Sequence, residues 1–235
     1  MGKPPFAMQR IEKTTDKMVW IDMGLKEAWE HLALKWKHHG MKLSGICGVL
    51  APIVAFAGIF LAIATYPEFS WQNNALSDMG SSEGITRMLF NNGLILGGLI
   101  GAVFAAGFFL YLKNGLLGKA SAAIFFLDAL ALTAIGVFPG DFAPQTHIHY
   151  YVSVAFFALF PISGIMVAVS FWKAGRKRLV AFTVALAAVA AAVWVAHWTI
   201  YPFGSDVAIP EIVAASAAGI WSVAIGVSMF RASDE

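Results

Sequence analysis

The sequence has few charged residues and almost no cysteine. Only 13% of its 235 residues are Asp, Glu, Lys or Arg, whereas 59% are hydrophobic. This composition excludes an ordinary soluble domain and indicates a polytopic membrane protein. The single cysteine, Cys47, excludes a disulfide framework and a cysteine metal site. The first apolar run begins near Leu43 behind a long charged segment, which predicts a retained helix and no cleaved secretory signal.

Six apolar runs have about the length, roughly 20 residues, that a helix needs to cross a bilayer. They predict an all-α fold, a six-transmembrane-helix bundle over residues 43–230. A cytoplasmic N-terminal segment, 1–42, precedes it, and a short tail, 231–235, follows it. The six runs cover about residues 43–65, 88–112, 120–138, 150–172, 179–201 and 212–230.

The second run carries a ridge of small residues, Gly93, Gly97 and Gly101, spaced four apart. Residues at this spacing share one helix face. Helices in membranes approach each other closely through such faces. The ridge therefore predicts close packing of a neighbouring helix and no chemistry of its own.

Basic residues are concentrated on one side of the predicted bundle. The N-terminal segment holds eight Lys and Arg, and the second loop, the fourth loop and the tail hold seven more, which leaves Arg87 alone on the other side. Cytoplasmic loops of membrane proteins carry an excess of Lys and Arg, so both termini are predicted to be cytoplasmic in a multi-pass protein of the cell membrane. Because topology accounts for these residues, we expect no nucleic-acid partner.

The N-terminal segment predicts an amphipathic helix over residues 19–37. Its apolar residues recur at helical spacing, and its charged residues mostly occupy other faces. Such a helix lies on the membrane surface or packs against a protein partner, and both alternatives are open. We expect it to end at His38 and His39, before Gly40. The apolar stripe consists of Ile21, Leu25, Trp29, Leu32 and Trp36.

The three loops on the opposite side gather most of the remaining titratable residues. The first loop contains the polar stretch 70–80, the third covers 138–149, and the fifth leads to Glu211. Within the first loop Leu76 and Met79 are apolar. Apolar side chains favour burial, so this loop is predicted to fold back onto the bundle.

Carboxylates and imidazoles in these loops form the candidate site, and we expect them to converge at the outer membrane boundary. These groups suit zinc above all, and also manganese or iron, and a metal with an open position can activate water. Alternatively, an Asp–His pair acts as a general base without metal. The catalytic assignment is Asp78, Asp141 and His149. The alternative metal assignment is Asp78, Asp141, His147, His149 and His197.

The same residues also fit structural roles. Ser77 and Asp78 suit the cap of a short re-entrant helix. Asp141 follows Pro-Gly, as turn residues commonly do. His197 suits the polar and aromatic belt at a membrane interface. Three further polar residues are candidates because they lie at the same layer: Asn74, Asn91 and Asn92.

Asp128 is a separate candidate, because it lies well inside the third apolar run. An ionisable residue at such a depth is costly and is a functional candidate by default. The structural alternative is an Asp that holds helices together by a hydrogen bond. No Lys or Arg of the membrane runs is available to pair with it, so we expect a neutral, hydrogen-bonded state and no ion pair.

Three stretches resemble a known family, domain-of-unknown-function family 998. They are Asn74-Ala-Leu-Ser-Asp-Met-Gly80, Phe90-Asn-Asn-Gly-Leu-Ile-Leu-Gly97, and Gly136-Val-Phe-Pro-Gly-Asp141 with a histidine after it. The resemblance covers roughly residues 43–230. It implies a six-helix membrane protein of the kind found chiefly in archaea and bacteria, and it implies no activity.

Three functions are compatible with the sequence. The first is a metal- or Asp/His-dependent hydrolase acting on a lipid or another amphipathic substrate. The second is a non-catalytic membrane subunit or scaffold that docks a partner protein through residues 19–37. The third is a small-solute transporter, which is disfavoured because the sequence shows no repeat and no pair of broken helices.

Overall fold

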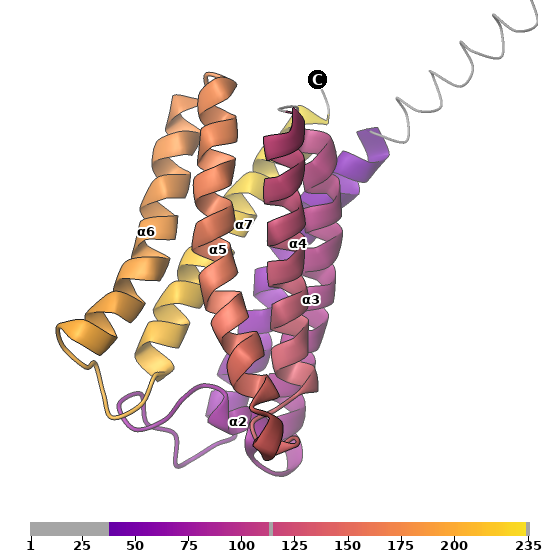
Figure 1. Ribbon diagram of the computed structural model, residues 1–235. Coiled ribbons are helices and arrows are strands. Elements are labelled where there is room, and N and C mark those ends of the chain that lie inside the picture. The colour runs from indigo at the N-terminus through magenta and orange to yellow at the C-terminus, as the bar shows by residue number, and fades with distance from the viewer. Residues whose placement is uncertain (1–37, 113–114, 234–235) are drawn as a thin grey trace, which may run out of the picture. The chain divides into compact units, whose positions relative to one another are not determined.

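The computed structural model describes residues 38–112 and 115–233, and within these residues all regular structure is helical (Figure 1). The described residues contain six helices that are long and apolar enough to cross a membrane. The predicted six-helix membrane bundle is therefore confirmed. Its helices are His38–Ala64, α3 (Gly84–Tyr111), α4 (Gly115–Val137), α5 (Ile148–Lys173), α6 (Lys177–Thr199) and α7 (Ala208–Ala232), with a short α2 (Asp78–Ser81) and a 3-10 turn η1 (Pro144–Thr146).

The first membrane helix begins earlier than expected. It is already helical at His38 and continues through Gly40, so the prediction that a helix ends before Gly40 is wrong. One glycine costs a helix interior only about 1 kcal/mol, whereas a break leaves several backbone groups without partners. The predicted amphipathic helix at 19–37 lies outside the described residues. The chain divides into two compact units, 1–40 and 41–235, and the bundle belongs to the second.

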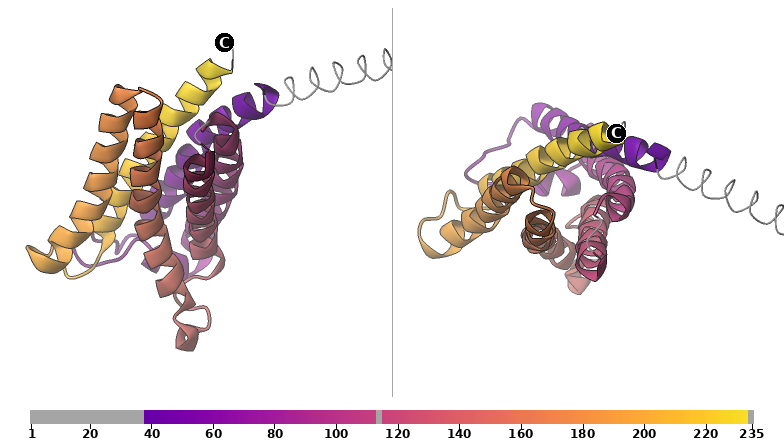
Figure 2. Two further views of the ribbon diagram at one scale, coloured as in Figure 1. Left: turned by 45° about the horizontal axis from the view of Figure 1, so that its top comes forward. Right: turned by 90° about the horizontal axis from the view of Figure 1, so that it is seen from above.

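The membrane helices follow one another around the bundle in chain order (Figure 2). The first helix closes the bundle by packing between α3 and α7. Ser44 Oγ donates a hydrogen bond of 3.1 Å to Val103 O of α3, and Ser222 Oγ of α7 donates one of 2.8 Å to Gly48 O. Each bond joins a serine side chain on one helix to a backbone carbonyl on its neighbour. Together they fix the position of the first helix along the axes of α3 and α7.

Glycines make the contact between the first helix and α3 very close. A Cβ atom at Gly93 would lie 2.7 Å from the Cα of Gly58, and one at Gly97 would lie 2.8 Å from Cβ of Ala55. Real Cβ atoms essentially never come within 3.0 Å of such atoms, so these positions require glycine. The predicted packing role of the ridge is confirmed for Gly93 and Gly97.

Two hydrophobic clusters fill the bundle at different levels. The aromatic cluster contains Phe104, Phe108, Phe125 and Trp221, and it lies toward the end of the bundle where Tyr111 and Met229 are buried. The second cluster lies toward the opposite end. It unites loop residues Leu76 and Met79 with membrane-helix residues that include Ile59, Phe90, Leu94 and Ile135.

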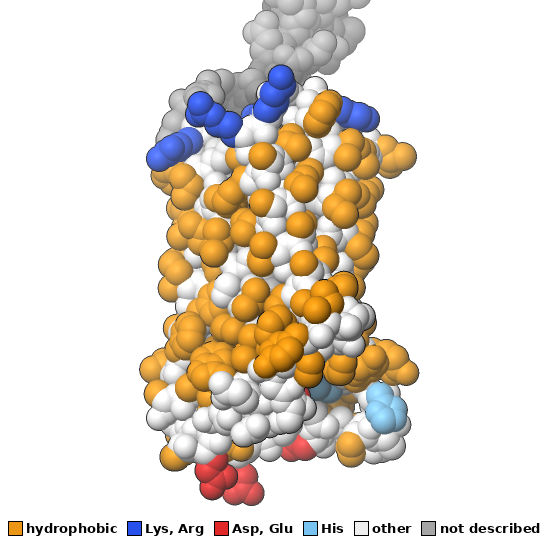
Figure 3. All heavy atoms as spheres, turned by 90° about the vertical axis from the view of Figure 1, so that its left-hand side faces the viewer, with side chains coloured by type: hydrophobic (Ala, Val, Ile, Leu, Met, Phe, Trp, Pro, Cys, Tyr) orange, Lys and Arg blue, Asp and Glu red, His pale blue; other side chains and the backbone are white. Residues whose placement is uncertain are grey.

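Most charged side chains lie at one end of the bundle or the other. On the face that Figure 3 shows, Lys and Arg side chains gather at one end, and Asp, Glu and His side chains gather at the other. Arg87 is the exception, because it pairs with Asp141 at the acidic end. The helix boundaries explain this arrangement, because Lys173 and Lys177 flank the turn between α5 and α6 and Asp141 lies between α4 and α5. The apolar exteriors between the two ends make the bilayer the environment of this protein.

Candidate intramembrane site

Loop one, residues 65–77 together with α2, folds back onto the bundle. Leu76 is 4% exposed and Met79 is fully buried, so the prediction of a folded-back loop is confirmed. Asn74 organises the loop: its Oδ1 accepts from Ser70 N at 2.9 Å, and its Nδ2 donates to Asp78 Oδ2 at 2.9 Å. Asp78 Oδ2 also accepts from Ala75 N at 3.1 Å. The short helix α2 exists as expected, but Ser77, at its N-cap position, makes no capping hydrogen bond.

Glu211 of α7 fastens loop one to the bundle. Leu76 N donates a hydrogen bond of 2.6 Å to Glu211 Oε2, and both residues are buried. A second hydrogen bond joins the same loop to α7: Ala208 N donates to Asn74 O at 2.9 Å. The carboxyl oxygen satisfies a buried backbone donor, and such a donor is costly to leave unpaired.

Glu211→Ala is therefore expected to release loop one. The orphaned Leu76 N–H should cost about 1–3 kcal/mol of stability, and amide hydrogen exchange across residues 74–81 should accelerate. Glu211→Gln is the matched control, because its side-chain oxygen can still accept the bond. Unchanged exchange in the alanine variant would contradict the role given to Glu211.

Asp141 is held by Arg87. Arg87 Nη1 and Nη2 donate to the two carboxylate oxygens of Asp141 at 2.6 and 3.1 Å, which ties the connection between α4 and α5 to the first turn of α3. The hydrogen bond from Arg87 lowers the pKa of Asp141 below its ordinary value. The predicted turn is also present, because Phe142 N donates to Pro139 O.

The Arg87–Asp141 pair gives a signed pH dependence. A lowered pKa in the folded protein means that the pair stabilises the fold above the ordinary pKa of an aspartate, and that this contribution disappears as the pH falls through the lowered value. Both side chains are more than one third exposed, so Asp141→Asn should cost at most about 1 kcal/mol at neutral pH. Thermal unfolding of both proteins from neutral to acid pH measures the difference. A gap that widens in acid would contradict the pairing.

The three histidines near these loops have separate surroundings. His149 Nδ1 lies 2.8 Å from Phe138 O, and because a carbonyl only accepts, the histidine donates. His197 is 6% exposed and its Nδ1 accepts from Phe203 N at 3.3 Å, so its side chain is buried within the protein. His147 is exposed and precedes α5 with a left-handed backbone, φ 53°.

Three of the predicted site residues form hydrogen bonds with different partners. Asp78 belongs to loop one, Asp141 pairs with Arg87, and His149 binds the end of α4. Loop one and the connection between α4 and α5 are close to each other, because a Cβ at Gly140 would lie 3.0 Å from Ser81 Oγ and 3.9 Å from His149 Cδ2. The convergence of Asp78, Asp141 and a histidine stays a prediction. Among the residues that the structure describes, no three His, Cys, Asp or Glu lie together as a metal site would need. The metal centre and the hydrolase that would use it stay predictions.

The two candidate asparagines differ. Asn91 Nδ2 donates to Gly80 O at 3.0 Å, which holds α2 against α3. Asn92 is exposed. Asn91 therefore has a structural role together with loop one. The other polar atom of its side chain, Oδ1, is buried and has no hydrogen bond in the described part of the chain.

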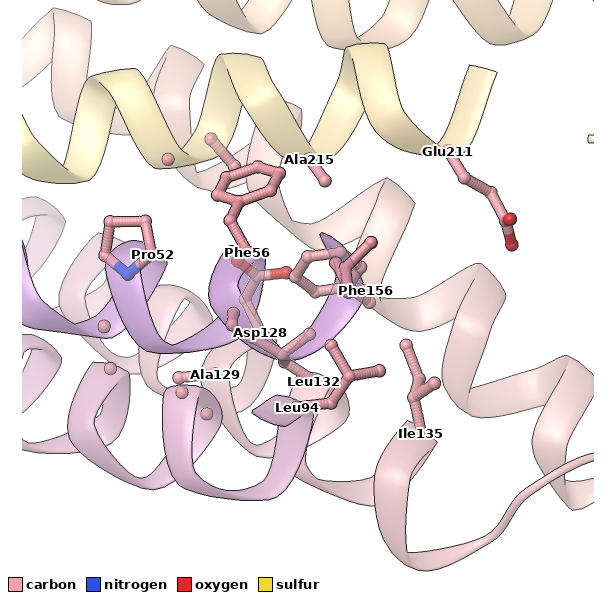
Figure 4. A pocket seen from close by; sticks show the side chains of 18 of the residues that line it. Pro52, Phe56, Leu94, Asp128, Ala129, Leu132, Ile135, Phe156, Glu211 and Ala215 are labelled. Atoms are coloured by element: carbon pink, nitrogen blue, oxygen red, sulfur yellow. The ribbon is translucent and has the colours of Figure 1, made fainter. Parts of the chain in front are cut away.

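A cavity of about 110 Å³ lies among the first helix, α3, α4, α5, α7 and loop one (Figure 4). Its walls are mostly apolar, and two buried acids line it, Asp128 of α4 and Glu211 of α7. Asp128 is 3% exposed, and its Oδ1 has no hydrogen-bond partner among the described residues. The predicted helix-bridging hydrogen bond of Asp128 is therefore not found there. Three serines complete the polar lining: Ser77, Ser153 and Ser222.

The structure joins residues that the sequence left apart. The sequence indicates Asp128 as a separate candidate and Glu211 as an outer-loop acid, yet both line one cavity with Ser77. A signal for Glu211 was present, because it lies among apolar residues at the start of a membrane run, just as Asp128 lies inside one. No local signal predicted that Arg87 would pair with Asp141, 54 residues away.

The family comparison agrees with the six-helix fold. The family described as "Protein of unknown function (DUF998)" matches residues 49–228, which include most of the membrane-helix residues and every residue of the cavity lining. No curated protein and no solved structure matches the chain. On this match, the chain is a member of domain-of-unknown-function family 998.

Proposed function

We propose that this protein binds an amphipathic molecule of the membrane in the cavity between Asp128 and Glu211. The observation that carries the proposal is Asp128, a carboxyl group 3% exposed that lines an apolar cavity and lacks a hydrogen-bond partner among the described residues. Leaving such a group unpaired costs free energy. A ligand that bonds to it would recover that cost, which is why unpaired intramembrane acids mark binding sites.

The composition of the cavity favours this kind of ligand. Small-molecule sites are mostly apolar and carry a few polar groups that orient the bound molecule. Here the apolar walls come from residues such as Leu94, Leu132 and Ile135, and the polar groups are two acids and three serines. An apolar chain with one polar head would therefore fill the cavity and satisfy Asp128.

The exposure of α5 supports entry from the side of the bundle. No residue of α5 before Phe160 is buried, whereas Phe160 and six later residues are. Ser153, Phe156 and Phe157 in this half-exposed part line the cavity. A molecule dissolved in the bilayer could pass beside these residues without crossing water. Binding of this kind is a step that lipid hydrolysis and transport share, and both functions, like the scaffold, stay predictions.

Photolabelling tests the proposal. The full-length protein in phosphatidylcholine nanodiscs is irradiated with a diazirine-bearing alkanol, and labelled positions are mapped by peptide mass spectrometry. We expect label at cavity-lining residues that unlabelled dodecanol displaces. Ala215→Phe should reduce this label because Ala215 lines the cavity. Ala224→Phe is the matched control, because Ala224 is a half-buried residue of the same helix outside the lining.

Two labelling results would contradict binding in the cavity. Label that spreads over the lipid-facing helix surfaces, and that dodecanol does not displace, would mean that the cavity takes up no such molecule. Equal labelling of wild type and Ala215→Phe would lead to the same conclusion.

We also propose that the end bearing Asp78 and Asp141 faces the outside of the cell and that both termini are cytoplasmic. The excess of Lys and Arg at the opposite end supports this orientation. In intact cells, a membrane-impermeant maleimide should label Glu83→Cys and should label Ala174→Cys only after permeabilisation. Both positions are exposed, at opposite ends of the bundle. The reverse labelling pattern would overturn the orientation.

A further inference from the structure

We infer that the ligand of this cavity carries an amine with at least one N–H group, and that Asp128 is its counter-ion. This inference rests on the proposed binding function and adds the chemical class of the ligand. It starts from the only polar side chain of the cavity that is both deeply buried and without a partner among the described residues, Asp128.

The charges around the cavity have one sign. Both titratable residues of the lining are acids, Asp128 and Glu211, and no Lys, Arg or His stands among the described residues that line it. Asp78 and Asp206 lie close enough to Glu211 for their charges to act on it. A site lined by acids alone can offer a counter-charge to a cation but none to a carboxylate or a phosphate. Fatty acids and phosphate-headed lipids are therefore disfavoured at this position.

The walls of the cavity are rich in aromatic rings. Five phenylalanines line it, and Figure 4 shows Phe56 of the first helix and Phe156 of α5 around the same cavity as Asp128 of α4. The face of an aromatic ring attracts a cation, and the attraction strengthens where water is excluded. The five residues are Phe56, Phe90, Phe125, Phe156 and Phe157.

Two other polar groups of the lining already have partners. Glu211 Oε2 already accepts from Leu76 N, and Ser222 Oγ already donates to Gly48 O. The bare Oδ1 of Asp128 needs a donor, which an N–H group supplies. A hydrogen bond between an ammonium and a carboxylate is roughly twice as strong as a neutral one. An alcohol fits the same position but brings no charge.

A series of ligands with one chain and three charges tests this inference. Dodecylamine, dodecanol and dodecanoate compete against the diazirine-bearing alkanol on the full-length protein in phosphatidylcholine nanodiscs. We expect dodecylamine to displace the probe at a concentration about tenfold or more below that of dodecanol, the difference between a charge-assisted and a neutral hydrogen bond. Dodecanoate should be the weakest competitor. Asp128→Asn should bring dodecylamine to the level of dodecanol.

A matched variant separates Asp128 from surface charge. Asp141→Asn also removes one carboxylate, but outside the cavity, so it should keep the preference for the amine. If Asp141→Asn loses the preference as Asp128→Asn does, or if Asp128→Asn keeps it, the assignment of Asp128 is overturned.

The results distinguish failure of this inference from failure of the proposed function. Equal displacement by amine and alcohol overturns the amine and leaves the binding function standing. Absence of any displaceable label overturns both. If Asp128→Asn does not fold, the wild-type series decides alone, because equal potency of dodecylamine and dodecanol there is sufficient to reject the inference.

Discussion

Asp128→Leu is expected to make the protein more stable and to abolish its selectivity for a polar head. The wild-type side chain is almost completely buried and its Oδ1 is unpaired among the described residues, which should cost about 1–3 kcal/mol. Leucine removes this cost and faces the apolar walls of a cavity that has room for it. A residue that is retained at the expense of stability is typical of functional sites.

Reversible unfolding in mixed micelles measures the change in the free energy of unfolding. Asp128→Asn is the control, because it keeps the shape and the polarity of the side chain and should not gain this stability. A loss of stability in Asp128→Leu would mean that Asp128 holds helices together. The main observation in favour of a binding site in the cavity would then be explained by a structural role.

Gly93→Ala is expected to destabilise the bundle by about 1–3 kcal/mol, the usual cost of forcing extra atoms into a packed interface. The added Cβ would lie 2.7 Å from Cα of Gly58, and backbone on both helices cannot move apart without opening the contact. Replacing glycine with alanine raises helix propensity by about 1 kcal/mol. We expect this gain to be smaller than the packing energy lost when the two helices are forced apart. The same unfolding measurement tests this expectation.

Gly101→Ala is the matched control on the same ridge. A Cβ at Gly101 would lie 3.4 Å from Cβ of Ala129, which is an ordinary contact, so this variant should be neutral or slightly stabilised. Equal effects of the two substitutions would show that the ridge contributes only helix propensity. The close contact between Gly58 and Gly93 would then contribute nothing to the free energy of unfolding.

Much of the architecture was predictable from the sequence. A chain that crosses a membrane must satisfy its backbone hydrogen bonds within helices, so an apolar run of sufficient length is enough to locate each span. The same reasoning extends to loop one, since Leu76 and Met79 could only be buried by folding back onto the bundle. The small-residue ridge predicted a close contact because glycine spacing of four defines one helix face.

The candidate site was predictable only in part. The sequence marked Asp128 because a charge inside an apolar run is conspicuous, and it marked Asn74, Ser77 and Asp78 as one polar loop. It did not indicate that Glu211 would accept from Leu76, which is 135 residues away. It also did not indicate that Arg87 would bind Asp141, since both were only assigned to the same side of the membrane.

The sequence by itself determined that the chain is a six-helix membrane protein and which residues lie at each end, because hydrophobic length and charge distribution are local properties. Apart from the face of α3 that carries Gly93 and Gly97, only the tertiary structure decided which helix faces meet. A membrane helix is apolar on all sides, so its sequence contains no amphipathic stripe that would show which face is inside. For that reason the joint presence of Asp128, Ser77 and Glu211 around one cavity follows from the packing of five helices and a loop, and from no pattern along the chain.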